Sequence, residues 1–273
     1  MHFHFGFTAV EVLWTLTFAG LLVLLVVLLG RDRARRYPWF TVSMVLMALR
    51  LLTSRLLFGR MAPITLSAIS ITLTDVTAIV GVLVVVEMAR RGFEGAPRRA
   101  WIAGAVALVA VCGGLLVAWG PWPAWKAVVE ASVLGILRLM QLVAQKGNLL
   151  ADLMMVGLGL LVMLFGRRYK AGWSSHTQRI VIGLSTASMA QIAVEVIWRE
   201  IAVHARPSSM AEYHHILGLQ EKLFNANNVV YLGVLVWWIV CLWKDEPGAK
   251  AEGEAAVEIR PDAPDSPTPS PSN

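Results

Sequence analysis

Charged residues are scarce in this sequence: only 15% of the 273 residues are Asp, Glu, Lys or Arg, whereas 57% are hydrophobic. A soluble domain carries about 25% charged residues on average. The scarcity of charge therefore argues against a soluble globular protein. The hydrophobic residues lie in long runs separated by short Arg-rich loops, which is the pattern of a multi-pass helical membrane protein.

Cysteines and the common catalytic or cofactor motifs are scarce or missing as well. The two cysteines, Cys112 and Cys241, both fall in hydrophobic runs, which excludes a disulfide framework. The last run has no lysine for a retinal Schiff base, and no histidine pair lies in the middle of the runs to hold haem. No phosphate-binding glycine loop, G-x-S-x-G, CxxC or H-E-x-x-H motif occurs. We therefore expect no cofactor and favour a protein that is not an enzyme.

Seven hydrophobic runs are long enough to cross about 30 Å of hydrocarbon as helices that rise 1.5 Å per residue. The first run has no basic segment ahead of it, so we expect a retained span there and not a cleaved signal peptide. The runs predict an all-α, polytopic transmembrane helical bundle with spans at Thr8–Gly30, Pro38–Phe58, Pro63–Met88, Ala100–Trp119, Asn148–Phe165, Ile180–Ile201 and Phe224–Trp243.

Basic residues are distributed unevenly between the two sides of this predicted bundle. Twelve lie in the loops that follow the first, third and fifth spans, and six lie in the other loops. Loops rich in Lys and Arg stay in the cytoplasm, so we predict an outside N-terminus and a cytoplasmic C-terminus. The protein is then expected in the cell membrane, surrounded by the lipid bilayer. The basic residues are spread over three short inner loops, which favours contact with lipid headgroups and not with nucleic acid. We also expect a cytoplasmic protein partner at these Arg-rich loops.

Two segments fall outside the predicted spans. Residues 124–146, turned as a helix, place their polar side chains in an arc of about 120°. They predict an amphipathic helix on the outer face, with an eighth span as the alternative. Residues 1–243 would then form one seven-helix domain. Residues 244–273 contain seven acidic residues, three basic residues and six of the twelve prolines, which predicts a disordered cytoplasmic tail.

A polar ridge runs along the sixth predicted span, where Gln191, Glu195 and Arg199 recur every four residues. Polar side chains in spans usually face the bundle interior or a wet cavity. The outer parts of the first, fifth and seventh spans carry further polar residues. The alternative is that these groups only hold helices together or sit in headgroup water. We predict an outward-facing cavity for a ligand, lined by Glu11, Asp152, Gln191, Glu195, Arg199, Asn225 and Asn228.

Three further charged residues lie within the second and third predicted spans or at their ends. Arg50 and Asp75 lie deep in the second and third spans, and an unpaired charge there is costly. They predict a buried ion pair, with a purely structural role as the alternative to a functional one. Glu87 precedes Arg90 and Arg91 by three and four residues, so we expect a solvated ion pair at the end of that helix.

Histidines and small residues raise two weaker hypotheses. The outer-side residues His204, His214 and His215 are candidate ligands for Zn²⁺, Cu²⁺ or Ni²⁺. Their spacing matches no closed metal motif, and exposed loop histidines are the alternative. In the fourth span, small residues form two series with a spacing of four, at 103–107 and at 110–114–118, which predict a close helix contact within the monomer or in a homo-oligomer. These small residues are Ala103, Ala107, Ala110, Gly114 and Ala118.

The segment RRYPWFTVSMVLMALR, residues 35–50, resembles one found in an uncharacterised family of bacterial multi-pass membrane proteins. The resemblance implies a bacterial cytoplasmic membrane and assigns no activity or functional residue. From the residues themselves we favour a ligand-sensing or ligand-binding protein that signals to a separate partner, since no output domain is fused. The alternative is a small-solute or ion transporter or channel, in which Arg50 and Asp75 continue the polar path. A membrane-embedded or metal-dependent enzyme comes third, because no nucleophile–base pair is visible.

Overall fold

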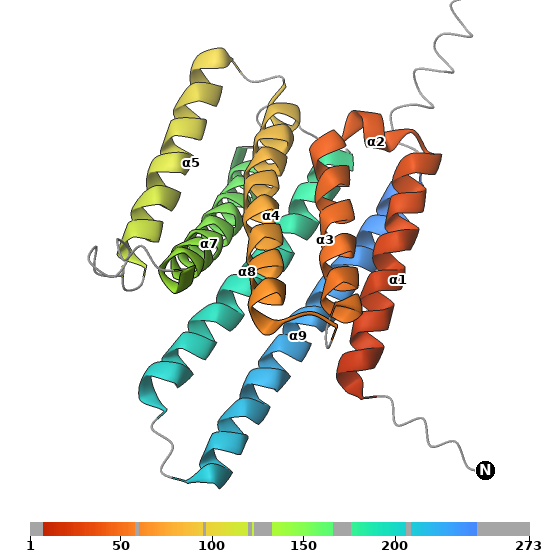
Figure 1. The fold of residues 1–273 in the computed structure, drawn as a ribbon. Coiled ribbons are helices and arrows are strands. Elements are labelled where there is room, and N and C mark those ends of the chain that lie inside the picture. Colours follow the sequence, from red (N-terminus) through yellow and green to blue (C-terminus); the bar gives the residue numbers. More distant parts are fainter. Residues whose placement is uncertain are drawn as a thin grey trace, which may run out of the picture.

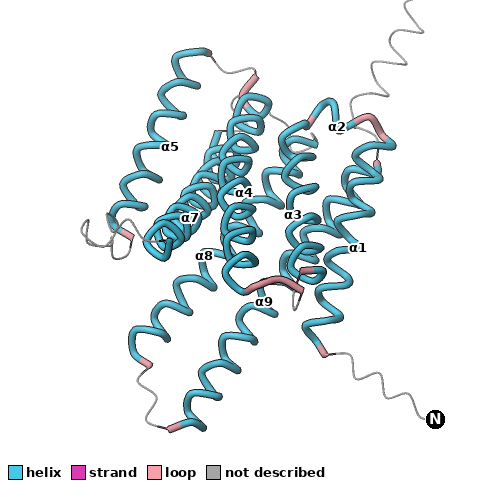
Figure 2. The backbone as a smooth tube through the Cα atoms, in the orientation of Figure 1, coloured by secondary structure: helices cyan, strands magenta, loops and turns pink. Residues whose placement is uncertain are grey.

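The computed structural model describes residues 8–57, 60–94, 97–119, 122, 133–165, 176–205 and 209–244. Within these ranges the chain forms helices and no strands (Figures 1 and 2). The helices are α1 (Ala9–Gly30), α2 (Arg33–Arg36), α3 (Pro38–Leu56), α4 (Pro63–Gly92), α5 (Arg98–Ala118), α7 (Val133–Phe165), α8 (His176–His204) and α9 (Met210–Trp243). Seven of them, all except the short α2, are long and apolar enough to cross a membrane. The predicted seven-span all-α bundle is confirmed, and the chain is a multi-pass membrane protein.

Several helices extend beyond the predicted spans. The four longest are α4 with 30 residues, α7 with 33, α8 with 29 and α9 with 34, and each exceeds about 40 Å at 1.5 Å per residue. From Val133 on, the expected amphipathic segment at 124–146 forms the first part of α7 and continues directly into the fifth span. Residues 123–132 and the expected tail from 245 onward lie outside the described residues.

Six of the long helices close a ring, in the order α1, α3, α4, α7, α8 and α9, with α9 packing back against α1. The helix α5 stands outside this ring and packs against α7 (Figure 1). Consecutive long helices alternate in direction, so the turn around α2 lies at the same end as the ends of α4 and α9 and the starts of α5 and α8.

The end of the bundle around α2 is called the basic end, and the end where α1 begins is called the opposite end. Which of the two faces the cytoplasm stays a prediction. The described basic residues at the basic end are Arg31, Arg33, Arg35, Arg36, Arg90, Arg91, Arg98, Arg99, Arg179 and Lys244.

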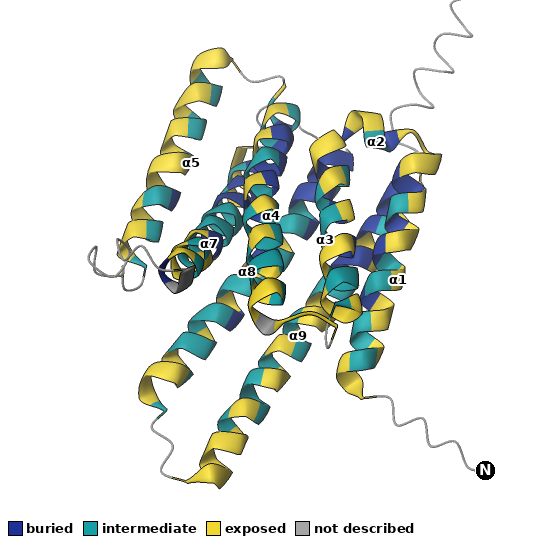
Figure 3. Ribbon diagram, in the orientation of Figure 1, coloured by how far each residue is buried: buried dark blue, intermediate teal, exposed yellow. Residues whose placement is uncertain are grey.

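The tightest packing lies in the half of the bundle nearer the basic end. Phe40, Met88 and Trp238 are fully buried there, and the Trp238 ring lies edge-on to Phe40 with 5.2 Å between centroids. A Cβ atom on Gly183 would lie only 2.3 Å from Trp238 Nε1, so the missing side chain makes room for the indole. Along α9, all of which is described, the first buried residue is Val234. Figure 3 shows the same gradient: toward the opposite end α9 is largely exposed, and α8 is a mixture of half-buried and exposed residues.

Small residues bring α4 and α7 close together. A Cβ on Gly81 would lie 3.1 Å from Ala151, and one on Gly147 would lie 3.1 Å from Ala78. The predicted stripe on α5, from Ala103 to Ala118, is exposed instead. It therefore makes no close helix contact within the described chain, and its contact with a second copy stays a prediction.

Candidate functional site

The polar ridge of α8 meets both of its neighbours in the ring. Ser188 Oγ donates a hydrogen bond to Asp152 Oδ1 of α7 at 2.7 Å. Three residues further along α8, Gln191 Oε1 accepts a hydrogen bond from Asn227 Nδ2 of α9 at 2.6 Å. Consecutive polar positions of α8 thus join two different helices, because residues three apart on a helix share one side but differ in direction by about 60°.

Two carboxylates and two cations continue this series toward the opposite end. Glu195 is half-buried and lies within electrostatic range of Lys146 on α7 and of Arg199, four residues further along α8. Asp152 in turn lies within electrostatic range of Glu195. The formal charges of the four side chains cancel, and a paired charge is far less costly in a poorly hydrated site than a single one. The name polar seam is used below for Lys146, Asp152, Ser188, Gln191, Glu195, Arg199 and Asn227.

Lys146 was not among the predicted site residues, because the sequence places it outside the fifth span. In the structure it lies in the continuous helix α7, where its ammonium group donates to the backbone carbonyl of Trp119. The same group lies 4.7 Å from the centroid of the Trp122 ring. This distance is within the range of a cation–π interaction, so the end of α5 holds the lysine in place.

Glu11 does not join the polar seam. It forms a capping box at the start of α1: its backbone N–H donates to Thr8 Oγ1, and its carboxylate accepts the Thr8 N–H, each at 3.3 Å. The other carboxylate oxygen lies 3.3 Å from Arg55 Nη2 at the end of α3. The T-x-x-E signature of this cap is present in the sequence and identifies a helix start.

The predicted α9 residues lie beside the seam but are not those that contact α8. Asn225 is half-buried and Asn228 is exposed, and neither makes a side-chain hydrogen bond to a described residue. Asn227 makes the contact with Gln191 instead. Its position follows from the buried periodicity of α9, extended backward by three or four residues at a time from Cys241, Trp238, Val234 and the half-buried Tyr231.

The structure does not bring Arg50 and Asp75 together in an ion pair. Arg50 is exposed on the surface of α3, six residues before the end of that helix at Leu56. That distance is about 9 Å along the axis, so the long side chain is able to snorkel to the headgroup region. Asp75 is half-buried, and its Oδ1 has no hydrogen-bond partner among the described residues.

The three candidate metal ligands are exposed at the opposite end. His204 Nδ1 lies 2.9 Å from the backbone carbonyl of Glu200 and 3.7 Å from its carboxylate. His214 packs against the neighbouring Tyr213 ring, and His215 is exposed beside it. Among the residues that the structure describes, no three His, Cys, Asp or Glu side chains are grouped to hold a metal ion.

A second polar group, buried at the basic end, was missed by the sequence reasoning. Arg33 is 9% exposed; its Nη1 lies 3.4 Å from His176 Nδ1, and its Nη2 donates to the Lys244 carbonyl at 2.7 Å. Nearby, the hydroxyl groups of Tyr37 and Thr177 are hydrogen-bonded at 3.0 Å. These contacts tie the α2 turn to the start of α8 and the end of α9. A loop arginine gives no periodic signal, so only the tertiary structure identifies it as buried.

Glu87 is buried, not solvated as predicted. It is 7% exposed, accepts the Phe40 backbone N–H at 3.0 Å and lies 3.9 Å from Arg91 Nε. The expected ion pair with the following arginines therefore exists, but α3 covers it. The reason is that the start of α3 packs directly against the last turns of α4.

Comparison with protein-family models, curated proteins and solved structures finds no match for this chain. The candidates for a functional site thus come from the structure alone, and they are the buried polar group around Arg33 and the polar seam. The group at the basic end links helix termini to one another. The polar seam lies within the long helices α7, α8 and α9 and combines acidic, basic and amide side chains from all three.

Proposed function

We propose that the protein is a ligand-sensing membrane protein that binds a small polar solute at the polar seam. The observation that carries the proposal is the convergence of polar side chains from α7, α8 and α9 along one ridge of α8. These side chains include two carboxylates, an ammonium group, a guanidinium group and two carboxamides. Such a set provides donors and acceptors for a solute that carries charges of both signs.

The unequal packing of α8 and α9 supports a sensing role. Both helices are tightly packed at the basic end; toward the opposite end α9 is largely exposed and α8 is only partly buried. A solute that replaces the Asn227–Gln191 hydrogen bond would favour a different separation of the two helices. Since each helix is continuous, that change would reach the basic end, where Arg33 contacts both helices. A ligand shifts such an equilibrium only when it binds one arrangement more tightly than the other.

The same packing favours sensing over transport. A transport path needs polar groups through the whole bundle, yet every ring helix contributes a fully or almost fully buried apolar side chain nearer the basic end. These side chains are Leu28, Phe40, Met88, Leu158, Ile180 and Trp238. The two charges that would continue the path, Arg50 and Asp75, are not paired.

A thermal-shift screen tests the proposal directly. The protein in lipid nanodiscs is heated with a panel of amino acids, carboxylates, sugars and inorganic ions. We expect at least one compound to raise the Tm, because a ligand at 100 times its Kd stabilises the folded state by about 2.7 kcal/mol. The rise should disappear in Glu195→Gln and persist in Glu221→Gln, a matched control that removes an exposed carboxylate from α9.

Two results would contradict the proposal. The seam is not a binding site if no compound shifts the Tm, or if Glu195→Gln responds as the parent does. Flux measurements in proteoliposomes with the identified compound then separate sensing from transport. Binding without movement across the membrane agrees with a sensor, whereas sustained accumulation inside the vesicles would identify a transporter.

A further inference from the structure

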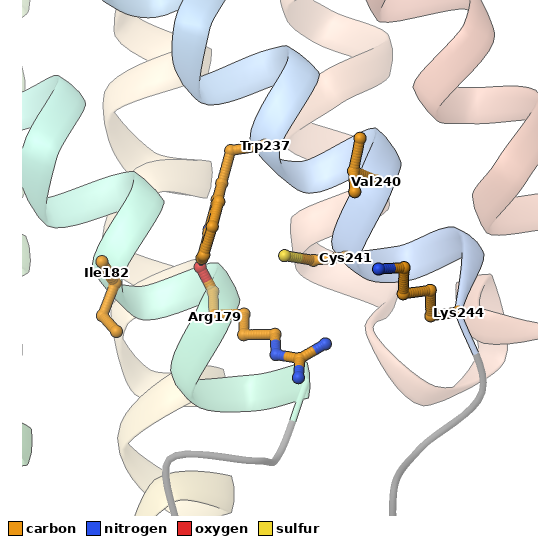
Figure 4. Close-up of a pocket in the computed structure, with 6 residues that line it drawn as sticks. All are labelled: Arg179, Ile182, Trp237, Val240, Cys241 and Lys244. Carbon is orange, nitrogen blue, oxygen red and sulfur yellow. The ribbon is translucent and has the colours of Figure 1, made fainter.

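A pocket of about 470 Å³ lies between the start of α8 and the end of α9, at the basic end (Figure 4). It is separate from the polar seam, which lies nearer the opposite end of both helices. The residues that line it are Arg179, Ile182, Trp237, Val240, Cys241 and Lys244.

The polar and apolar groups of this pocket are arranged by depth. Arg179 and Lys244 lie at its rim, beside the ends of the two helices (Figure 4). Ile182 lies about one turn deeper along α8, and Trp237 about two turns deeper along α9. Together with Val240, these two side chains form what is called here the apolar wall. The indole N–H of Trp237 donates to the Arg179 backbone carbonyl at 3.4 Å, which joins the wall to the rim.

The rim carries positive charge that no residue in the described part of the chain neutralises. Neither the Arg179 guanidinium nor the Lys244 ammonium forms an ion pair with a described residue, and no acidic side chain is among the described residues that line the pocket. By contrast, the guanidinium groups of Arg35, Arg55 and Arg91 each lie within 4 Å of a carboxylate. Two cations on one rim, with no carboxylate partner among the described residues, attract an anionic group.

The apolar wall faces the surroundings of the bundle. Trp237 is 47% exposed and Val240 is 49% exposed, although both lie within the seventh candidate span. In a multi-pass protein such residues contact acyl chains. The pocket therefore combines a cationic rim beside the helix ends with an apolar surface deeper along the helices.

We propose that this pocket binds an anionic phospholipid, with its phosphate between Arg179 and Lys244 and an acyl chain along the apolar wall. Basic pockets between transmembrane helices are known to bind acidic headgroups. A free phosphate ion would use the rim but not the wall. The lipid holds the start of α8 and the end of α9 together at the basic end. This proposal is independent of the proposed sensing role, which does not need a bound lipid.

Native mass spectrometry of the full chain in detergent measures the binding of phosphatidylglycerol and phosphatidylcholine. The double variant Arg179→Gln/Lys244→Gln should bind phosphatidylglycerol about 25-fold more weakly, because each interfacial cation contributes about fivefold in affinity. The matched control Arg98→Gln/Arg99→Gln removes two exposed cations from α5 at the same end of the bundle and should bind as the parent does. The exchange Arg179→Lys/Lys244→Arg keeps both charges and should keep most of the affinity.

Val240→Phe provides a second test that leaves the charges unchanged. Val240 is half-exposed, so the larger ring is tolerated in the fold but fills the pocket, and phosphatidylglycerol binding should weaken severalfold. Excess inorganic phosphate should leave the bound lipid in place.

Each of the following results overturns the proposal. Equal binding of phosphatidylcholine would show that the charge of the lipid does not matter. An equal loss in the Arg98→Gln/Arg99→Gln control would show general surface attraction. Displacement by inorganic phosphate would show that the cationic rim alone determines binding and that the apolar wall contributes nothing. Unchanged binding in both Arg179→Gln/Lys244→Gln and Val240→Phe would place the lipid elsewhere.

Discussion

The Glu87 carboxylate of α4 accepts the backbone N–H of Phe40 in α3 at 3.0 Å. The helix α3 begins at Pro38 and has no side-chain cap of its own. Its first-turn N–H groups need an acceptor, and a negative charge is favoured at a helix N-terminus. Glu87 is thus a helix cap supplied by a neighbouring helix, and it fixes the start of α3 against the end of α4.

Removal of this cap should destabilise the protein. Glu87→Ala leaves the Phe40 N–H buried without an acceptor, so we expect the free energy of unfolding to fall by about 1–3 kcal/mol. Denaturant unfolding in detergent micelles measures the change. The control Glu94→Ala removes an exposed carboxylate just after the same helix, and its effect should stay within about 0.5 kcal/mol. Equal effects of the two variants would contradict the capping role.

The contact between Gly183 and Trp238 leads to a second prediction. In Gly183→Ala the added methyl group meets the indole ring at its Nε1, Cε2 and Cζ2 atoms, all within 3.0 Å. The ring is fully buried and cannot move away freely, so we expect a loss of about 1–3 kcal/mol in unfolding free energy. Gly104→Ala on α5 is the matched control, since no atom lies within 4 Å of the position that its added methyl group would take. The idea fails if both alanine variants unfold like the parent.

The link between α8 and α9 is measurable as a coupling energy. A double-mutant cycle with Gln191→Leu and Asn227→Leu should give about 0.6 kcal/mol, the average for hydrogen bonds between transmembrane helices, and at most about 1.7 kcal/mol. The comparison cycle pairs Gln191→Leu with Asn225→Leu, whose side chain makes no hydrogen bond to α8. Coupling near zero is expected there. Similar values in both cycles would show that the Asn227 contact has no special strength.

The predicted orientation is open to a labelling experiment. In a background with Cys112→Ser and Cys241→Ser, single cysteines are introduced as His214→Cys at the opposite end and Arg98→Cys at the basic end. Both positions are exposed. A membrane-impermeant maleimide should label the first in intact cells and the second only after lysis, because the basic end is predicted to be cytoplasmic. The reverse pattern would invert the topology.

Much of the fold was predictable because hydrocarbon imposes a local constraint on the sequence. Any segment that crosses it needs about 20 apolar residues, so the seven runs mark seven spans. The ends of the helices were less predictable. The run ending at Met88 continues as α4 to Gly92, and the run starting at Phe224 is preceded by 14 residues of the same helix. Helices continue through headgroup and water layers, where hydropathy carries no signal.

The site was predictable in part. Helical periodicity placed Gln191, Glu195 and Arg199 on one side of α8, as polar residues on one side of a helix tend to share an environment. Periodicity does not name the neighbour that a side chain meets. For this reason Asn227 was missed, Glu11 was expected in the cavity although it caps its own helix, and Arg50 was expected to pair with Asp75.

By itself the sequence determined that this chain is a bundle of seven membrane-crossing helices, because each crossing depends on the residues of a single segment. The tertiary structure alone decided which helices close the ring, that Arg33 and Glu87 are buried, and where a pocket opens between α8 and α9. These features depend on contacts between residues that are far apart in the chain, such as Glu87 with Phe40 and Arg33 with His176. Such contacts leave no pattern in any one segment.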